Sequence, residues 1–386
     1  CRILNVTSPE YLATLGYGVL IGSGFGAVIE NNYFERCRHS VAAGATPTPF
    51  NAIIKDNYSY NCGIGTNDYD CHAATIGFVF ENNTTHAGPN GRGGFVIRSV
   101  DAVLKGNHVY GGSIGITNAD GITATTFPLG RITLSDNVIK DNAAGYGIDI
   151  SGGGISSISI SGGSIERCSL GINATGTSEN LKVTGVSFLN MTSHAIQLDD
   201  CVGAVVSNCT FDGTTICLST LSSCSNIAMT NCVGKNVSNS LISTYITDNV
   251  AVSNCTVSGI TASSAIYFNR SNNCRVENCI ISMGNAIYDG IRAWGSSATA
   301  HNISVIGNKV TGGYKYGLYA FTNSDTITAI GNDFRQATTA AVYAPDATMY
   351  YFFANASHTV DHGDITESGT GPGLNIHAKV IDSTNV

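Results

Sequence analysis

The sequence predicts an all-β protein built as a parallel β-helix, a solenoid of about 12 to 13 coils. A short phrase ending in Asn recurs about every two dozen residues, for example at 30–32, 55–57, 81–83 and 105–107, and again as far as 330–332. Charged residues make up only 12% of the 386 residues, and there are 45 glycines. Few charges with many Gly, Asn, Ser and Thr favour stacked strands and tight turns over exposed helices.

Each repeat is expected to contain a strand, an Asn turn, a second strand and a longer loop. Short apolar strands precede the Asn phrases, such as 27–29, 78–80, 102–104 and 132–134. The second strands alternate with a period of two, as half-buried strands do, and include 94–98, 114–118, 147–151, 195–199 and 265–268. We expect the coils to end near Arg335, in a β-helix domain of residues 1–348. Residues 349–386 lose the period and are expected to form a cap or an appended segment.

Two residue types are expected to stack between coils. An Asn at each turn would form hydrogen bonds with the backbone of the neighbouring coil. Cys209, Cys232, Cys255 and Cys279 follow the same spacing. Because adjacent coils lie ~4.8 Å apart, a column of buried, reduced thiols is the simplest interpretation of these cysteines. That interpretation favours folding in a reducing bacterial cytoplasm, even for a protein that acts outside the cell.

The charge of the chain limits its partners. A net charge of −8 opposes nucleic-acid binding, which needs clustered Lys and Arg. The uncharged stretch 11–29 contains many glycines and alternates like a strand, so we expect no membrane insertion. No zinc, calcium or dinucleotide motif is present in the sequence, and no cofactor is expected.

The first candidate site lies on three successive early coils. Arg can hold a sugar carboxylate in a two-pronged hydrogen bond, and a His or Tyr can remove the neighbouring proton or protonate a leaving oxygen. If His39 and His72 occupy equivalent positions, their imidazoles would stack one coil apart. The alternative is a polar ladder on the coil surface with no catalytic role. The residues expected here are Arg38, His39, Tyr69, Asp70, His72, Arg92 and Arg98.

Two further groups of residues are candidates. Asp149 and Asp199 are expected to point outward two coils apart, with Asp120, Asp200 and Asn118 on nearby loops, and paired carboxylates suit glycoside hydrolysis. Turn chemistry is the alternative explanation for these Asp residues. Further along the chain, Trp294 lies among Tyr and Arg residues that could form a sugar-binding platform, with loop packing as the alternative.

The coil pattern resembles the pectate-lyase-like right-handed β-helix superfamily over nearly the whole chain. Arg38-His39, Asp70-Cys71-His72 and Arg98 resemble the Arg-His, Asp-x-His and Arg of bacteriophage tailspikes and related polysaccharide lyases. Residues 69–72 are also similar to the Asp-Pro-His stretch of mannuronan epimerases, with Cys71 in place of Pro. The resemblance implies a homotrimer exposed on the virion, acting on a bacterial surface polysaccharide.

The resulting expectation is a tailspike depolymerase that cleaves an acidic capsular or O-antigen polysaccharide by β-elimination. His39 or His72 would be the base, Tyr69 the acid, and Arg38 and Arg98 the groups that neutralise the carboxylate. Arg92, Asn118, Asp149 and Trp294 would bind substrate. An endo-glycosidase that uses Asp149, Asp199 or Asp200 and a non-enzymatic adhesin fibre are the alternatives.

Overall fold

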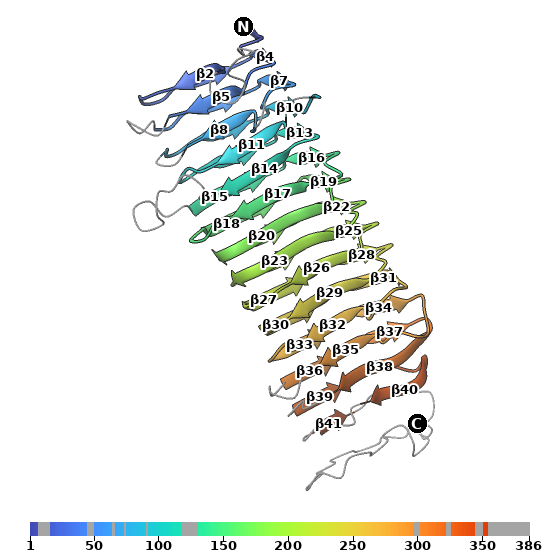
Figure 1. Ribbon diagram of the computed structural model, residues 1–386. Coiled ribbons are helices and arrows are strands. Elements are labelled where there is room, and N and C mark those ends of the chain that lie inside the picture. Colours follow the sequence, from blue (N-terminus) through green and yellow to red (C-terminus); the bar gives the residue numbers. More distant parts are fainter. Residues whose placement is uncertain are drawn as a thin grey trace. The chain divides into compact units, whose positions relative to one another are not determined.

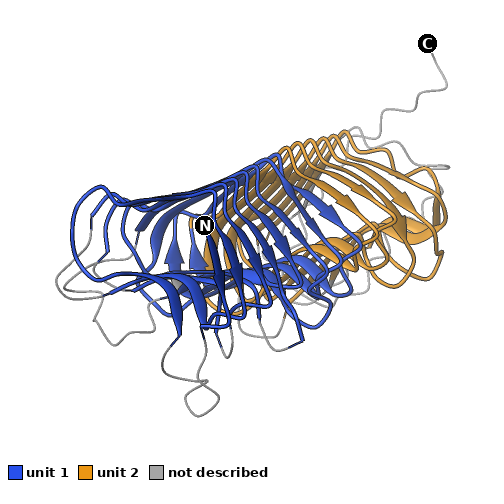
Figure 2. Ribbon diagram, turned by 90° about the horizontal axis from the view of Figure 1, so that it is seen from above, with its two compact units in different colours: residues 1–202 blue, residues 203–386 orange. Residues whose placement is uncertain are grey.

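The computed structural model describes residues 1–6, 16–44, 50–63, 66–72, 75–89, 92–117, 130–295, 302–321, 326–343 and 350–353. Every regular element in these ranges is a β-strand, and they contain no helix long and apolar enough to cross a membrane. The chain divides into two compact units, residues 1–202 (unit 1) and 203–386 (unit 2), coloured separately in Figure 2.

Unit 1 is a parallel β-helix with three strands in each complete coil, and these strands form three ladders (Figure 1). The first ladder consists of β1 (Arg2–Leu4), β4 (Tyr33–Glu35), β7 (Tyr58–Tyr60), β10 (Thr84–His86), β13 (His108–Tyr110), β16 (Val138–Lys140), β19 (Ser164–Glu166) and β22 (Ser187–Leu189). The second consists of β2 (Tyr17–Ile21), β5 (His39–Ala43), β8 (Tyr69–Cys71), β11 (Gly94–Ile97), β14 (Ser113–Thr117), β17 (Tyr146–Ser151), β20 (Leu170–Glu179) and β23 (His194–Val202). The third consists of β3 (Val28–Glu30), β6 (Ile53–Lys55), β9 (Val79–Glu81), β12 (Val103–Lys105), β15 (Gly130–Ser135), β18 (Ser156–Ser161) and β21 (Lys182–Thr184).

Unit 2 repeats the same arrangement. Its first ladder consists of β25 (Thr210–Asp212), β28 (Val233–Lys235), β31 (Thr256–Ile260), β34 (Ile280–Met283) and β37 (Lys309–Thr311). The second consists of β26 (Ile216–Thr220), β29 (Ser240–Tyr245), β32 (Ile266–Asn269), β35 (Ile291–Trp294), β38 (Tyr314–Phe321) and β40 (Ala337–Tyr343). The third consists of β24 (Val205–Ser207), β27 (Cys224–Thr230), β30 (Thr247–Ser253), β33 (Cys274–Glu277), β36 (Asn302–Ile306), β39 (Thr326–Ile330) and β41 (Tyr350–Phe353).

The fold confirms the predicted coils and adds a strand to each of them. The sequence predicted two strands in a repeat, but the three-residue strands of the first ladder follow the Asn turns directly. Each of these strands buries a single side chain, such as Phe34 in β4 or Val109 in β13, so its alternation is too short to recognise in the sequence. The coils also continue beyond Arg335, because β40 pairs with β38 and β41 pairs with β39.

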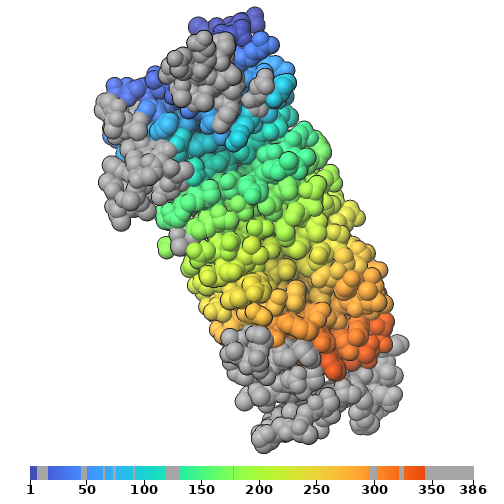
Figure 3. Space-filling view, in the orientation of Figure 1, coloured from blue at the N-terminus to red at the C-terminus, as the bar shows by residue number. Residues whose placement is uncertain are grey.

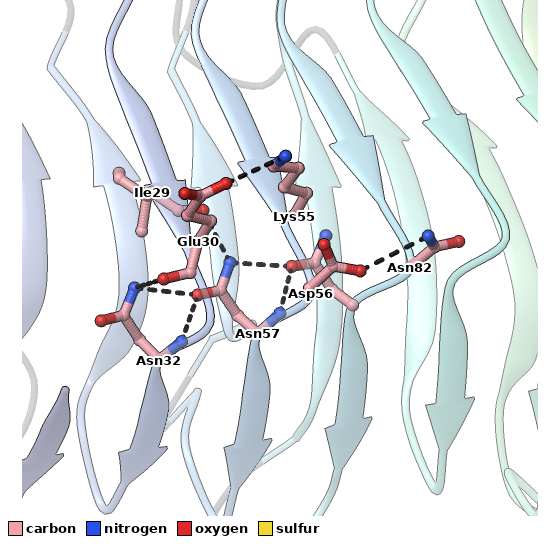
Figure 4. A network of polar contacts seen from close by, with 8 residues as sticks. Ile29, Glu30, Asn32, Lys55, Asp56, Asn57 and Asn82 are labelled. Carbon is pink, nitrogen blue, oxygen red and sulfur yellow. Dashed lines mark hydrogen bonds and ion pairs between the residues drawn. The ribbon is translucent and has the colours of Figure 1, made fainter.

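The predicted Asn stack is present at the turn between the third and first ladders (Figure 4). The side chain of Asn57 accepts hydrogen bonds from the backbone and side-chain nitrogens of Asn32 at 3.0 Å, and donates one to the carbonyl oxygen of Ile29 at 2.9 Å. Asn83, Asn107 and Asn137 continue the column. The residue before each stacked Asn has a positive φ, which explains why Gly106 stands in one of these turns and Asn or Asp in the others.

In unit 2 the corresponding column begins with four cysteines and continues with Asn308 and Asn332. Cys209, Cys232, Cys255 and Cys279 are all buried, and each thiol donates to a backbone carbonyl of its own turn at 3.3 Å. None of the 13 cysteines forms a disulfide bond in the structure, and the column has the geometry expected of a buried thiol stack. Asn and Cys therefore stabilise the turns, and the chemistry of the site must come from the outer surface, where successive coils form successive bands (Figure 3).

Candidate active site

Asp70 is the centre of a charged cluster on the second ladder of unit 1. Within β8, Tyr69 and Cys71 point into the core, so Asp70 between them points to the outer face. Its side chain is nevertheless only 3% exposed, because Arg98 and two imidazoles cover it. A buried carboxylate in a folded protein needs such partners.

The basic side chains around Asp70 come from three successive coils. Nη2 of Arg98, just after β11, lies 2.5 and 2.6 Å from the two carboxylate oxygens. Nε2 of His72, just after β8, lies 3.4 Å from Oδ2, and Nε2 of His39, in β5, lies 3.7 Å from the same atom. The His72 side chain is 34% exposed and that of His39 only 1%, so His72 is the imidazole that a ligand can reach.

His39 is held from two sides. Its Nδ1 lies 2.7 Å from the backbone carbonyl oxygen of Asn67, and since a carbonyl only accepts, Nδ1 carries the proton. Its ring stacks on Tyr17 with centroids 5.5 Å apart and planes 7° apart. Burial lowers the pKa of His39, opposed by the Asp70 charge, so the ring is neutral near pH 7 and its Nε2 presents a lone pair toward Asp70.

Tyr17 is a residue that the sequence analysis missed. It pairs in register with His39, and its hydroxyl accepts a hydrogen bond of 2.9 Å from Nη1 of Arg38. The Arg38 guanidinium also lies 5.5 Å from the centre of the Tyr17 ring. Counting one repeat back from His39 would have found Tyr17, but no Asn phrase marks the coil to which it belongs.

Tyr69 does not occupy the position expected of a catalytic acid. It is fully buried, stacks on Phe95 at 4.8 Å and accepts a hydrogen bond from the Ser59 hydroxyl at 3.0 Å. Burial raises its pKa far above the usual value for tyrosine. A substrate on the outer face cannot reach this hydroxyl, so Tyr69 is a core residue.

The expected equivalence of His39 and His72 is also corrected by the register. Val41 pairs with Tyr69 and Ala43 with Cys71, so His39 lies opposite Tyr17 of the previous coil and not opposite His72. The two imidazoles converge on Asp70 from different positions along their strands instead of stacking. Inward-facing residues such as Val41 and Tyr69 set this register.

Asp149 lies on the same face as Asp70, three coils further on. Asp70, Val96, Gly115 and Asp149 pair in sequence, so they form one column of outward positions. Oδ1 of Asp149 accepts a hydrogen bond of 2.8 Å from Asn173, the next residue in the column. The column is therefore polar at Asp70 and again at Asp149 and Asn173, with Val96 and Gly115 between them.

The remaining predicted residues are more scattered. Asn118 and Asp120 lie outside the described residues. Arg92 is exposed before β11, and its backbone nitrogen binds the carbonyl oxygen of Gly63. Trp294 ends β35 and belongs to unit 2, whereas the Asp70 cluster belongs to unit 1.

Metal ligands do not gather in this part of the molecule. Within the described ranges, no group of three or more His, Cys, Asp or Glu side chains could hold a metal ion. The arrangement around Asp70 instead suits proton transfer. A carboxylate that contacts an imidazole orients the ring and stabilises its protonated form, and the nearby guanidinium groups can bind an anionic substrate.

Comparisons with known proteins show the fold. No curated protein matches the sequence. A mutant of the periplasmic alginate epimerase AlgG shares 10% identity at a TM-score of 0.54, covering 86% of this chain and 84% of its own. The AlgE4 A-module of the Azotobacter vinelandii mannuronan C-5 epimerase shares 13% identity over 95% of this chain and 100% of its own, and a PL6 alginate lyase shares 11% over 97% and 88%. Both TM-scores are below 0.5, at 0.45 for the A-module and 0.44 for the lyase.

A family model for the right-handed β-helix region matches residues 123–238 and 170–334, which is more than half of the chain. The chain therefore belongs to the right-handed β-helix family and has the pectate-lyase-like fold that its coil pattern resembles.

Proposed function

We propose that the protein is a polysaccharide lyase that cleaves an acidic bacterial surface glycan by β-elimination. The observation that carries this proposal is the convergence of Arg98, His72 and His39 on the nearly buried carboxylate of Asp70. Proton abstraction next to a sugar carboxylate needs a base and a cation close together, and these residues supply both.

Each residue has a defined part in the proposed reaction. His72, exposed and oriented by Asp70, removes the proton from the carbon next to the sugar carboxylate, whose charge Arg38 and Arg98 neutralise. The electrons of that C–H bond form a double bond, and the bond from the neighbouring carbon to the glycosidic oxygen breaks. The leaving oxygen takes its proton from the hydroxyl of Tyr17, which replaces the buried Tyr69 in this role.

Epimerisation of the same carbon is a second candidate. Removing a proton with one group and returning it with another inverts a carbon without breaking the chain, and His72 and the Tyr17 hydroxyl are two such groups. The Asp70-Cys71-His72 stretch, similar to that of mannuronan epimerases, supports this reading as well.

Hydrolysis by paired carboxylates is less well supported. Asp199 is in register with Thr175 of the preceding coil, so it lies two coils beyond Asp149 and two positions further along the strand. Strand spacing places Asp149 and Asp199 about 12 Å apart at Cα, which is longer than glycoside hydrolysis requires between its carboxyl groups.

The test is incubation with acidic capsular and O-antigen polysaccharides, followed by mass and NMR analysis of the products. A lyase gives shorter chains that end in an unsaturated sugar, an epimerase gives full-length polymer with inverted residues, and a hydrolase adds water to each cut. His72→Ala should lose at least about 100-fold in rate, the lower end of what a general base contributes, and Tyr69→Phe should lose little. Retained activity in His72→Ala, or binding without any change in the polymer as expected of an adhesin, would refute the proposed chemistry.

We extend the proposal to a homotrimeric tailspike on a phage virion, because the early-coil motifs resemble those of tailspike depolymerases. Light scattering of the purified protein tests the trimer, and labelling of phage particles with an antibody to the protein tests the location. A monomer in solution, or particles without label, would remove this extension while leaving the enzymatic proposal intact.

A further inference from the structure

A second group of outward-facing side chains surrounds Arg292 in unit 2. Tyr267, Arg292 and Tyr319 pair in register on β32, β35 and β38, and Trp294 lies two positions along from Arg292 on the same face. The Arg292 guanidinium lies 5.6 Å from the centre of the Tyr267 ring, 5.1 Å from that of Tyr319 and 4.7 Å from that of Trp294. One cation is thus enclosed by aromatic rings on three sides.

Neighbouring protein groups compensate the positive charge of Arg292 only in part. Its Nε is buried and has no hydrogen-bond partner within the described structure. The nearest carboxylate oxygen recorded there, Oδ2 of Asp289, lies 4.0 Å from Nε, which is beyond hydrogen-bond distance. Aromatic rings attract the cation but offer no lone pair to its N–H groups. The Arg292 side chain is 32% exposed, so an acceptor can reach it from solvent.

The surroundings of Arg292 select the class of ligand. A guanidinium binds a carboxylate with two parallel hydrogen bonds. Lys315, whose Nζ lies 5.0 Å from the centre of the Tyr316 ring, adds a second positive charge, while Asp289 supplies one negative charge. The half-buried rings of Tyr267, Trp294 and Tyr319 offer apolar surface to the C–H face of a sugar. A carboxylated sugar meets all of these features, whereas a neutral sugar would leave the Arg292 donors unpaired.

We propose that Arg292, Tyr267, Trp294 and Tyr319 form a binding site for a uronic-acid residue of an oligosaccharide. The Trp294 predicted from the sequence to bind substrate is one wall of this site, and Arg292 is its anion ligand. The site holds glycan without cutting it, so it does not depend on the reaction proposed for unit 1.

Asp289 gives the site a pH dependence. This side chain is 7% exposed, and burial raises its pKa to about 6, while Arg292 and Lys315 act in the opposite direction. The Tyr319 ring also faces this pair. As the pH falls through 6, Asp289 takes up a proton and no longer offsets the charge of Arg292. A uronate remains ionised there, so its affinity should rise between pH 7.5 and pH 5.5.

The only tryptophan of the chain provides the measurement, because Trp294 is a wall of the site. Trp294 fluorescence would be recorded during titration of the full chain with hexamers of galacturonate, mannuronate and guluronate, and with neutral maltohexaose as the control. The Asp70→Asn background excludes turnover. We expect a saturable change in emission with at least one acidic hexamer, stronger at pH 5.5 than at pH 7.5, and none with maltohexaose.

Two variants that remove the same charge give the matched comparison. Arg292→Gln should weaken binding about tenfold or more, as expected for the loss of a charge-assisted hydrogen bond. Arg275→Gln, at an exposed position on β33 that is not part of the site, should change affinity less than about threefold, as a screened surface charge does. Circular dichroism of both variants separates a folding defect from lost binding. An emission that no acidic hexamer alters, or that responds equally in Arg292→Gln, overturns the proposal, while failure of the unit 1 reaction leaves it unaffected.

Discussion

Replacing Arg98 by Met should leave the carboxylate of Asp70 buried without its main partner. Asp70 is 3% exposed, and Nη2 of Arg98 contacts both of its oxygens, whereas the nearest imidazole nitrogen, Nε2 of His72, is 3.4 Å away. Removing one member of a buried ion pair costs about 3–5 kcal/mol. Because two imidazoles still face Asp70, we expect the lower end of this range, about 3 kcal/mol for Arg98→Met, which is a large share of the stability of a typical domain.

Urea unfolding followed by far-ultraviolet circular dichroism measures this cost. The double variant Asp70→Leu with Arg98→Met should recover most of the loss, since neither charge is then left alone. Arg131→Met, which breaks the exposed pair with Asp101, is the matched control and should have a much smaller effect. An Arg98→Met midpoint equal to that of the wild type would refute the view of Asp70 as a buried, compensated charge.

Two further predictions concern stability. The Asn107 side chain is fully buried and makes four hydrogen bonds with the coils on both sides. Asn107→Ala should therefore lower the free energy of unfolding by about 3 kcal/mol in the same assay. Lys105→Ala, on the exposed side of that turn, should lower it by less than about 1 kcal/mol. Burial lowers the pKa of His39 in the folded state below its value of 6.5 in the unfolded chain. The unfolded chain therefore binds the proton more readily, and the free energy of unfolding falls as the pH drops from 6.5 toward the folded-state pKa. The slope is at most about 1.4 kcal/mol per pH unit. His39→Gln should flatten this dependence between pH 7.5 and pH 5.5, and an equal decline in both proteins would contradict the role of His39.

The sequence predicted the repeat far better than the register of its residues. The Asn phrases identify the coil because a left-handed turn residue recurs between the third and first ladders, and a buried Asn or Cys often follows it. They do not identify which residues of the following loop belong to the strand. His39 and Tyr69 were misplaced for that reason: a shift of one residue exchanges the inner and outer faces. Tyr17 was missed because its coil has no Asn phrase.

The Asp70 cluster shows how a β-helix can build a site without disturbing its core. Tyr69 and Cys71 hold β8 in place from the inside, while Asp70 between them points outward to meet side chains of the preceding and following coils. Residues 28 positions apart in sequence, Asp70 and Arg98, thereby come within hydrogen-bond distance. The same geometry places Tyr267, Arg292 and Tyr319 side by side in unit 2. In both units the inner residues fix the register and the outer residues alone are available for chemistry, so each group can change its ligand while the coils that carry it stay the same.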